Sequence, residues 1–209
     1  NFIRTLPYEL TDDQQNALET IIQNITKTTD KKILLQGDVG SGKTIVSLII
    51  SLLFNLNKMQ VVYLAPTTVL AEQQYEEFVS LLPVMSQQIG LVTSSTELFE
   101  PKQILIGTTA ILARKEKVLD KPGLIIIDEQ HRFGVKQRES IEEFLNSDRI
   151  NPVTLNMTAT PIPRTLAQAI FGDIEVVTIK SKPKNRKPIN TKIVPKDKRS
   201  ASFEWIRSQ

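Results

Sequence analysis

Two short segments of the chain carry residues whose types and spacing suit chemistry. The first, GDVGSGKT, spans residues 37–44 and fits the pattern GxxxxGK(S/T). The second, DEQHRFGVKQR, spans residues 128–138, begins with two adjacent carboxylates and contains His131, the only histidine in the sequence. Taken alone, the second segment is compatible with a metal site, a general acid/base pair or a polar loop. The surroundings of each segment decide among these.

The glycine-rich segment is predicted to bind phosphate. It follows the apolar segment KILLQ and precedes an apolar helical pattern, the strand–loop–helix context in which this spacing binds nucleotides. Its glycines allow a tight turn, and amides of the loop and of the helix N-terminus can donate to an anion. A glycine-rich turn with a surface lysine is the alternative. The predicted nucleotide-binding residues of the loop are Gly37, Asp38, Val39, Gly40, Ser41, Gly42, Lys43 and Thr44.

Catalytic roles follow for the two residues that end the first segment and the two that begin the second. Lys43 is expected to reach the β- and γ-phosphates of ATP, while the Thr44 hydroxyl helps to hold Mg²⁺. Asp128 is expected to hold the same Mg²⁺, usually through water, and Glu129 to orient and deprotonate the attacking water. A solvated junction between strand and loop is the alternative for the acidic pair. For His131 the absence of cysteine and of a second histidine argues against zinc, which leaves a hydrogen-bonding relay or an ordinary loop histidine.

Short apolar segments alternate with amphipathic helical patterns along the chain. Strands are predicted at 32–36, 61–65, 89–92, 103–107, 124–128, 153–157 and 174–179, and helices at 12–25, 43–56, 68–82 and 135–146. Thr11 is a candidate N-cap for the first of these helices. The alternation indicates an α/β fold with a parallel sheet covered by helices on both faces, in which ligands bind at the carboxyl ends of the strands.

Composition is that of a soluble globular protein: 40% of the 209 residues are hydrophobic and 23% are charged. The absence of cysteine excludes disulfides and thiolate metal sites, and fits a reducing compartment. The longest apolar segment, IVSLIISLLF, is too short to span a bilayer and contains two serines, so we interpret it as a buried helix. The chain begins at Asn1 with no signal peptide, and we expect it to be part of something longer.

The composition changes after Ile179. Residues 180–199 hold nine Lys/Arg and one acid, a balance of +8 within a net charge of +3. This basic block can attract nucleic acid or an acidic surface, or can serve as a solvated linker. We expect residues 1–180 to form one lobe and 181–188 to be a linker. Residues 189–209, with one strand (INTKIV) and one helix (KRSASFEWIRSQ), then begin a truncated second domain.

Further segments resemble a known family. APTTVLAEQ at 65–73, GTTAIL at 107–112 and MTATPIPRTLA at 157–167 accompany the two motifs in the order seen in superfamily 2 helicases and translocases. With LPYELTDDQ at 6–14 and DEQHRFGVKQR, the chain most resembles the RecG family of bacterial double-stranded DNA translocases, which remodel stalled replication forks and branched junctions. Thr109 stands where that family usually has histidine, which leaves only the contact of Thr109 in doubt.

Two alternatives to the RecG family remain. The Mfd family of transcription-repair coupling factors shares GDVG, RFGV and TATPIPRTL but typically has DEEQ or DEEH in place of DEQH, and PriA is more distant at these motifs. A P-loop kinase, a nucleotide switch or a non-catalytic nucleotide-binding module is the alternative from a different class. A kinase would usually carry an arginine-rich lid segment after the core, and the sequence shows none.

The resemblance implies a RecA-like P-loop NTPase lobe that uses ATP and Mg²⁺ in the cytoplasm, without a membrane. It places Gln14 on the adenine. Residues implied to couple DNA binding to hydrolysis are Gln130, His131, Thr158 and Thr160, although the TAT segment can also cap a helix. Residues implied to contact the DNA track, or else to form capping turns, are Pro66, Thr67, Thr68, Gly107 and Thr108.

The implied partners are double-stranded and branched DNA, including forks and Holliday junctions, together with a second motor lobe and a wedge domain of the same parent chain. The second lobe of the family supplies arginines to the γ-phosphate, and such an arginine is worth about 10³ to 10⁵ in rate. We therefore expect these 209 residues alone to bind nucleotide weakly, hydrolyse it slowly and not unwind DNA.

Overall fold

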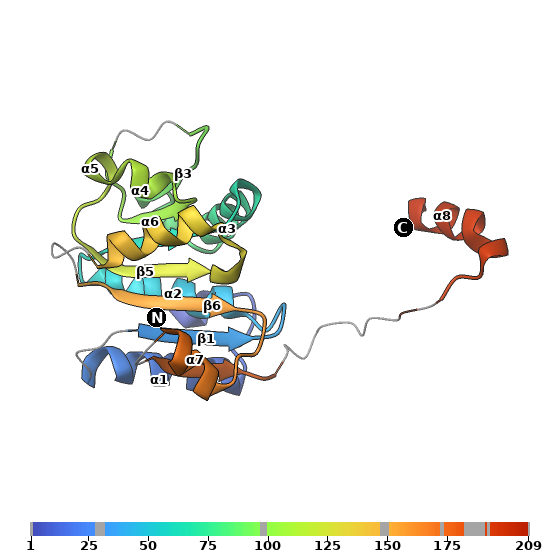
Figure 1. Ribbon diagram of the computed structural model, residues 1–209, viewed down its shortest axis with the longest axis horizontal. Helices are drawn as coiled ribbons and strands as arrows, with labels where there is room; N and C mark the ends of the chain where they lie inside the picture. Colours follow the sequence, from blue (N-terminus) through green and yellow to red (C-terminus); the bar gives the residue numbers. More distant parts are fainter. Residues whose placement is uncertain are drawn as a thin grey trace.

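The computed structural model describes residues 2–27, 32–96, 100–146, 151–171, 174–181, 191 and 193–208. Its centre is a seven-stranded sheet in the order β3-β4-β2-β5-β6-β1-β7, in which every neighbouring pair is parallel (Figure 1). All seven predicted strands are confirmed. The strands are β1 (Lys32–Gly37), β2 (Gln60–Leu64), β3 (Ile89–Val92), β4 (Ile104–Gly107), β5 (Pro122–Asp128), β6 (Val153–Thr158) and β7 (Glu175–Ile179).

Helices lie on both faces of the sheet, as predicted. They are α1 (Asp12–Lys27), α2 (Lys43–Leu56), α3 (Thr68–Leu81), α4 (Ala110–Ala113), α5 (Lys115–Val118), α6 (Val135–Leu145), α7 (Arg164–Phe171) and α8 (Arg199–Arg207). One core contains residues of α1, α2 and α3, and the core on the opposite face contains residues of α4 and α6. A small third cluster joins α7 to β1. The 3-10 turns are η1 (Phe2–Thr5), η2 (Pro83–Gln88), η3 (Gln130–Arg132) and η4 (Lys196–Lys198).

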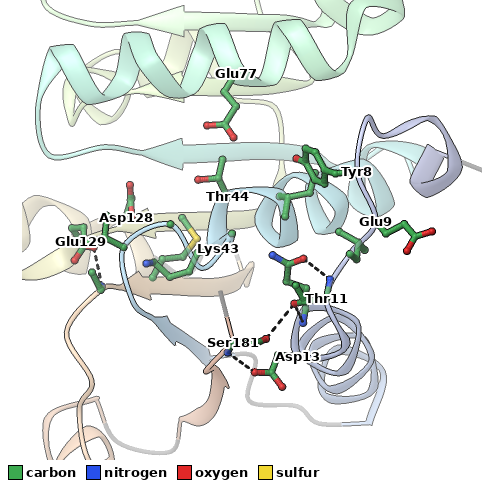
Figure 2. Close-up of a pocket in the computed structure, with 18 of the residues that line it drawn as sticks. Tyr8, Glu9, Thr11, Asp13, Lys43, Thr44, Glu77, Asp128, Glu129 and Ser181 are labelled. Carbon is green, nitrogen blue, oxygen red and sulfur yellow. Dashed lines mark hydrogen bonds between the residues drawn. The ribbon is translucent and has the colours of Figure 1, made fainter. Parts of the chain in front are cut away.

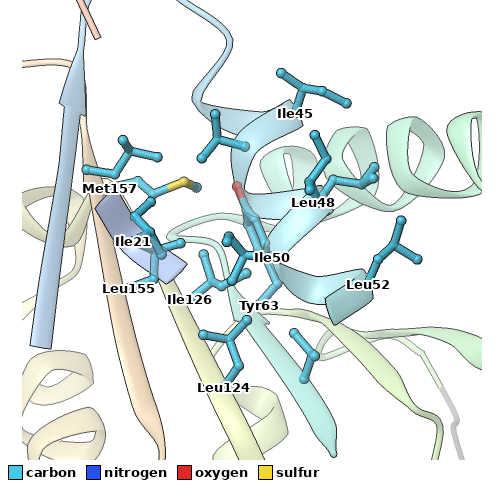
Figure 3. Packing of buried hydrophobic residues seen from close by; sticks show 14 of the residues in the cluster. Ile21, Ile45, Leu48, Ile50, Leu52, Tyr63, Leu124, Ile126, Leu155 and Met157 are labelled. Carbon is cyan, nitrogen blue, oxygen red and sulfur yellow. The ribbon is translucent and has the colours of Figure 1, made fainter. Parts of the chain in front are cut away.

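The two covered faces explain why the strands are apolar throughout. Leu34 and Leu35 are neighbours in β1, yet Leu34 packs under α7 while Leu35 joins the core below α1 and α2. Side chains alternate across a strand, so burial on both faces requires apolar residues at consecutive positions. Figure 3 shows the larger core, with Ile50 of α2 above Leu124 and Ile126 of β5.

The apolar segment IVSLIISLLF forms most of α2, and nine residues of this helix are buried. The prediction of a buried helix is therefore confirmed. Within the described ranges, no helix combines the length and apolar character needed to cross a membrane.

The segment beyond β7 differs in part from the prediction. The helix predicted near the C-terminus is present as α8, which Figure 1 shows apart from the sheet. The strand predicted at 189–194 is wrong at its described positions: Thr191, Ile193 and Val194 adopt no strand, and Ile193 is 95% exposed. A lone strand without a neighbouring ladder leaves its backbone groups unpaired, so it is not stable. The linker predicted at 181–188 lies outside the described residues except for Ser181.

Candidate active site

The predicted site residues meet at one edge of the sheet. Strands β5, β6 and β1 are adjacent, so their carboxyl ends bring the acidic pair, the TAT segment and the glycine-rich loop together. A cavity of about 1330 Å³ opens there, between this edge and the segment that precedes α1 (Figure 2). This is the place at which open α/β sheets bind ligands.

The glycine-rich loop forms a tight turn directly before α2. The Ser41 N–H donates to the Asp38 carbonyl at 3.0 Å, and Gly40 and Gly42 have φ values of 75° and 86°. A side chain at Gly42 would also collide with the Gln14 amide. Helix α2 begins directly after Gly42 without a side-chain cap, so its first N–H groups remain available to an anion.

Lys43 lies above this loop and faces the acidic pair. Its Nζ donates to the Gly37 carbonyl at 2.7 Å and, less closely, to the Asp38 carbonyl at 3.4 Å. Burial lowers the pKa of Lys43, while the charges of Glu129, Asp128 and Asp38 act in the opposite direction. A half-buried ammonium beside a glycine-rich turn and the uncapped N-terminus of α2 is suited to a phosphate group.

Asp128 is partly buried at the end of β5. Burial, with a further contribution from Glu129, raises the pKa of its carboxyl to about 6, although Tyr63, Lys43 and Arg132 favour the charged form. The Tyr63 hydroxyl donates to Asp128 Oδ2 at 3.1 Å. Asp128 and Thr44 line the same cavity, and oxygen ligands of this kind suit Mg²⁺.

Glu129 has a left-handed backbone with φ of 46°, which for a residue other than glycine costs on the order of 1–3 kcal/mol. Its N–H donates to the Met157 carbonyl at 2.9 Å, and its Oε1 accepts from the Ala159 N–H at 2.8 Å. The strained turn thus aims the carboxylate across β6, onto the TAT segment. Such strain is typical of functional positions.

The predicted coupling residues surround Glu129. The Thr158 hydroxyl donates to Glu129 Oε2 at 3.4 Å and lies 2.9 Å from the Thr160 hydroxyl, while His131 Nδ1 lies 3.4 Å from the same Glu129 oxygen. Gln130 follows in η3, and its buried Oε1 has no hydrogen-bond partner among the described residues. The structure therefore brings three of the four onto or beside one carboxylate.

Gln14 reaches the same loop from α1. Its Nε2 donates to the Ser41 carbonyl at 2.8 Å, and its Oε1 accepts from the Thr11 N–H at 2.9 Å. The Gln14 N–H donates to the Thr11 hydroxyl at 3.3 Å, which confirms Thr11 as the N-cap and forms a capping box. Gln14 is 3% exposed, so it joins the helix cap rigidly to the phosphate loop.

The start of α1 also binds the end of the lobe. Asp13 Oδ2 accepts hydrogen bonds from the N–H groups of Lys180 (2.9 Å) and Ser181 (2.7 Å). These bonds, led by those from Ser181, lower the pKa of Asp13. Ser181 thereby becomes part of the cavity wall.

The segments predicted to contact DNA lie side by side, because β2 and β4 are adjacent and the Ala65 N–H donates to the Gly107 carbonyl at 2.8 Å. The hydroxyls of Thr67 and Thr108 accept from the N–H groups of Leu70 and Ala110, each at 3.3 Å. Both hydroxyls thus have the capping role considered as the alternative. Pro66 is buried, whereas Thr67 is exposed and Thr68 is partly exposed.

Thr109, the residue at which the chain departs from the RecG pattern, contacts the motif that follows the acidic pair. Its hydroxyl accepts from Gln137 Nε2 at 3.4 Å, while Gln137 Oε1 accepts from the Gly134 N–H at 2.9 Å. Phe133 is 3% exposed and anchors that motif in the core on the α6 face. The segment RFGVKQR is thus fixed between β5 and α4.

Several cavity residues were not predicted from the sequence. Tyr8 and Glu77 face the same cavity (Figure 2); burial raises the pKa of both groups, and Glu77 adds to the shift of Tyr8. Arg132 lines the cavity from η3. Tyr63 does not line the cavity but contacts Asp128 from the core. It is a tyrosine within a largely apolar strand, and the meaning of that signal depends on which strands are neighbours.

Asp128→Asn is expected to stabilise the nucleotide-free chain at neutral pH. The folded state raises the carboxyl pKa from 3.8 to about 6, so the charged carboxylate is disfavoured by folding. This penalty is complete above pH 6, shrinks as the pH falls towards 3.8, and disappears below it. We expect the free energy of unfolding at pH 7.5 to rise by on the order of 2 kcal/mol. Urea unfolding between pH 4 and 7.5 measures it; the same gain at every pH would contradict the account.

A glycine-rich phosphate loop on β1, an acidic pair two strands away on β5 and a parallel sheet covered on both faces define a RecA-like P-loop NTPase lobe. Residues 11–169 match the model of the DEAD/DEAH box helicase family. The chain belongs to that family.

Individual relatives carry the name RecG. The chain is 38% identical to ATP-dependent DNA helicase RecG of Synechocystis over 100% of its own length and 26% of the relative's. It is 36% identical to RecG of Thermotoga maritima, again over its whole length and 27% of the relative's. The chain thus spans about a quarter of the length of these curated relatives.

Two solved structures are similar to this chain. A structure of RecG bound to a three-way DNA junction matches 99% of this chain and 28% of that one, with a TM-score of 0.75 and 34% identity. A hypothetical ATP-dependent RNA helicase from Sulfolobus tokodaii matches 85% of this chain and 55% of its own, with a TM-score of 0.63; at 21% identity it supports the fold alone.

Proposed function

We propose that the chain is the ATP-binding motor lobe of a RecG-like DNA translocase that uses ATP hydrolysis to remodel stalled forks and branched DNA in the cytoplasm. The observation that carries the proposal is the meeting of Lys43, Asp128 and Glu129 at the carboxyl edge of one sheet. Their positions allow one cation to face phosphate, one carboxylate to face a metal ion and one to face water. We infer the DNA substrate from the similarity to RecG over the full length of this chain.

The phosphate loop binds the triphosphate in this proposal. The amides of residues 37–44 and the N-terminus of α2 surround the phosphates, and Lys43 exchanges its loop carbonyls for β- and γ-oxygens. Thr44 and Asp128 would hold Mg²⁺, which would neutralise negative charge on the phosphates. Glu129, held by the Ala159 N–H, accepts the proton of the attacking water. Gln14 presents the edge of its amide to the adenine while it holds the Ser41 carbonyl.

In this proposal, DNA binding and ATP hydrolysis are coupled through the residues around Glu129 and through the carboxyl ends of β2 and β4. Thr158, Thr160, His131 and Gln130 report the state of the γ-phosphate in this proposal. Thr158 and His131 adjoin the carboxylate that positions the water, and Thr160 adjoins Thr158. The segments 66–68 and 107–108 offer hydroxyls and helix N-termini to DNA phosphates without reading bases.

In this proposal, the lobe acts together with further domains of a longer parent protein. We propose that residues 1–180 form the first RecA-like lobe, that 181–188 form the linker and that 189–209 begin the second lobe. The exposed side chains of α8 fit this division: Phe203, Trp205 and Ile206 are at least 60% exposed, as expected for a helix whose core partners lie in another part of the protein. That second lobe supplies the arginines, and a wedge domain splits DNA branches.

The proposal is tested by ATP hydrolysis of the full-length protein with and without forked DNA. We expect slow turnover alone and stimulation by the fork, with single-stranded DNA and a matched linear duplex as comparisons. Phosphate transfer to a small-molecule acceptor, or hydrolysis that is indifferent to every DNA, would contradict it.

His131→Ala in the full-length protein is expected to weaken the stimulation of hydrolysis by DNA more than the binding of ATP or DNA. The imidazole lies 3.4 Å from the Glu129 oxygen and is half exposed, so its removal leaves the phosphate loop and the fold unchanged. We expect DNA-stimulated turnover to fall about tenfold, the upper range of one modest hydrogen bond. Lys136→Ala, on the exposed face of α6, is the control. Undiminished stimulation would make His131 an ordinary loop residue.

A further inference from the structure

Tyr63 lies beside the acidic pair but belongs to none of the motifs. It stands in β2 directly opposite Ile126 of β5, two residues before Asp128, and its side chain is fully buried. Its hydroxyl donates to Asp128 Oδ2 at 3.1 Å. A buried phenol needs a polar partner, and Asp128 is the one that the described part of the chain provides.

The Tyr63 ring is held firmly. It packs edge-on against Phe78 of α3, with 5.8 Å between ring centroids and an interplanar angle of 75°. Figure 3 shows it between α2 and β5, surrounded by Ile50, Leu124 and Ile126. Because the interior is close-packed around this ring, the hydroxyl has a fixed position and fixes the carboxylate that it contacts.

We propose that Tyr63 is a positioning residue that holds the Asp128 carboxylate in the orientation that meets the Mg²⁺ of Mg·ATP. The inference rests on the proposed function, in which Asp128 holds that ion. With Oδ2 engaged by the hydroxyl, Oδ1 is the oxygen left for the cavity that Thr44 also lines.

Without the hydroxyl, two effects would disorder this arrangement. The terminal torsion of an aspartate is broad, so the carboxylate can rotate when no partner holds it. The adjacent Glu129 carries the same charge and repels it. Hydrogen bonds from outer groups to metal-binding carboxylates are typically worth about 10- to 100-fold in metal affinity.

Tyr63→Phe tests the inference because it removes one oxygen and leaves the ring contacts in place. The quantity to measure is the gain in affinity for a fluorescent ATP analogue on going from EDTA to saturating Mg²⁺. We expect this gain to fall about tenfold in Tyr63→Phe, while affinity in EDTA stays within about twofold because the phosphate loop is intact. Tyr75→Phe, on α3 outside the cavity, is the matched control and should match wild type.

Each outcome has one meaning. A wild-type gain that Tyr63→Phe retains in full overturns the inference and leaves the proposed function standing. Equal losses with and without Mg²⁺ also overturn it, because they make Tyr63 a purely structural residue. A wild-type chain that binds no nucleotide refutes the proposed function and this inference together. If thermal melting shows that Tyr63→Phe does not fold, Phe78→Leu is the second variant, because it loosens the ring but keeps the hydroxyl. We expect Phe78→Leu to lose part of the gain in affinity with Mg²⁺. An unchanged gain overturns the inference.

Discussion

Lys43→Ala is expected to abolish binding of Mg·ATP to this chain. The Lys43 ammonium is the cation that the structure places over the phosphate loop, and each hydrogen bond between charged groups is worth about 1.5–3 kcal/mol. The loss of contacts to both the β- and the γ-phosphate should therefore weaken binding at least about 100-fold. Isothermal titration calorimetry with a non-hydrolysable analogue measures the effect.

The fold should survive this substitution, because the hydrogen bonds that the Lys43 ammonium donates among the described residues go to loop carbonyls. Lys117→Ala removes one lysine from the exposed surface of the short helix α5 and is the charge-matched control. Wild-type affinity in Lys43→Ala would show that the glycine-rich segment is a structural turn and not a phosphate site.

Glu129→Gln is expected to separate binding from turnover in the full-length protein. Gln keeps an oxygen that accepts from the Ala159 N–H, so the strained turn after β5 remains in place. It cannot take a proton from water, and loss of a general base costs about 10²- to 10⁴-fold in rate. We expect ATP affinity within about twofold of wild type and a loss of steady-state hydrolysis of at least about 100-fold.

The matched control is Glu142→Gln on the exposed surface of α6. A nucleotide-binding titration beside a steady-state assay gives both numbers on the same preparation. Preserved hydrolysis would assign the base to another group. Loss of binding together with turnover would mean that Glu129 holds the loop and not the water.

The architecture was predictable because burial on both faces gives each strand an apolar signature. Segments such as VVYLA and LIIID carry that signature locally, and the phosphate-loop spacing fixes its own strand–loop–helix context. The helices α4 and α5 have four residues each, too short to show periodicity, so they were not predicted. The prediction of a strand at 189–194 was wrong although the apolar pattern is present, because no neighbouring strand pairs with the described residues of this segment.

The sequence predicted which residues form the site better than it predicted the contacts among them. The motifs named Lys43, Asp128 and Glu129, but the left-handed backbone of Glu129 and its bond to the Ala159 N–H depend on the adjacency of β5 and β6. Tyr63 reaches Asp128 across 65 positions of sequence, because β2 pairs with β5. Long-range pairing of this kind has no local signal.

The most direct test of the central claim is the crystal structure of this chain with Mg²⁺ and a non-hydrolysable ATP analogue. We expect the β- and γ-phosphates within the turn of residues 37–44, with the Lys43 ammonium moved from the Gly37 carbonyl to phosphate oxygens. We also expect the metal ion between Thr44 and Asp128. A nucleotide bound elsewhere, or a Lys43 that keeps its 2.7 Å bond to Gly37 while nucleotide is bound, would contradict the central claim.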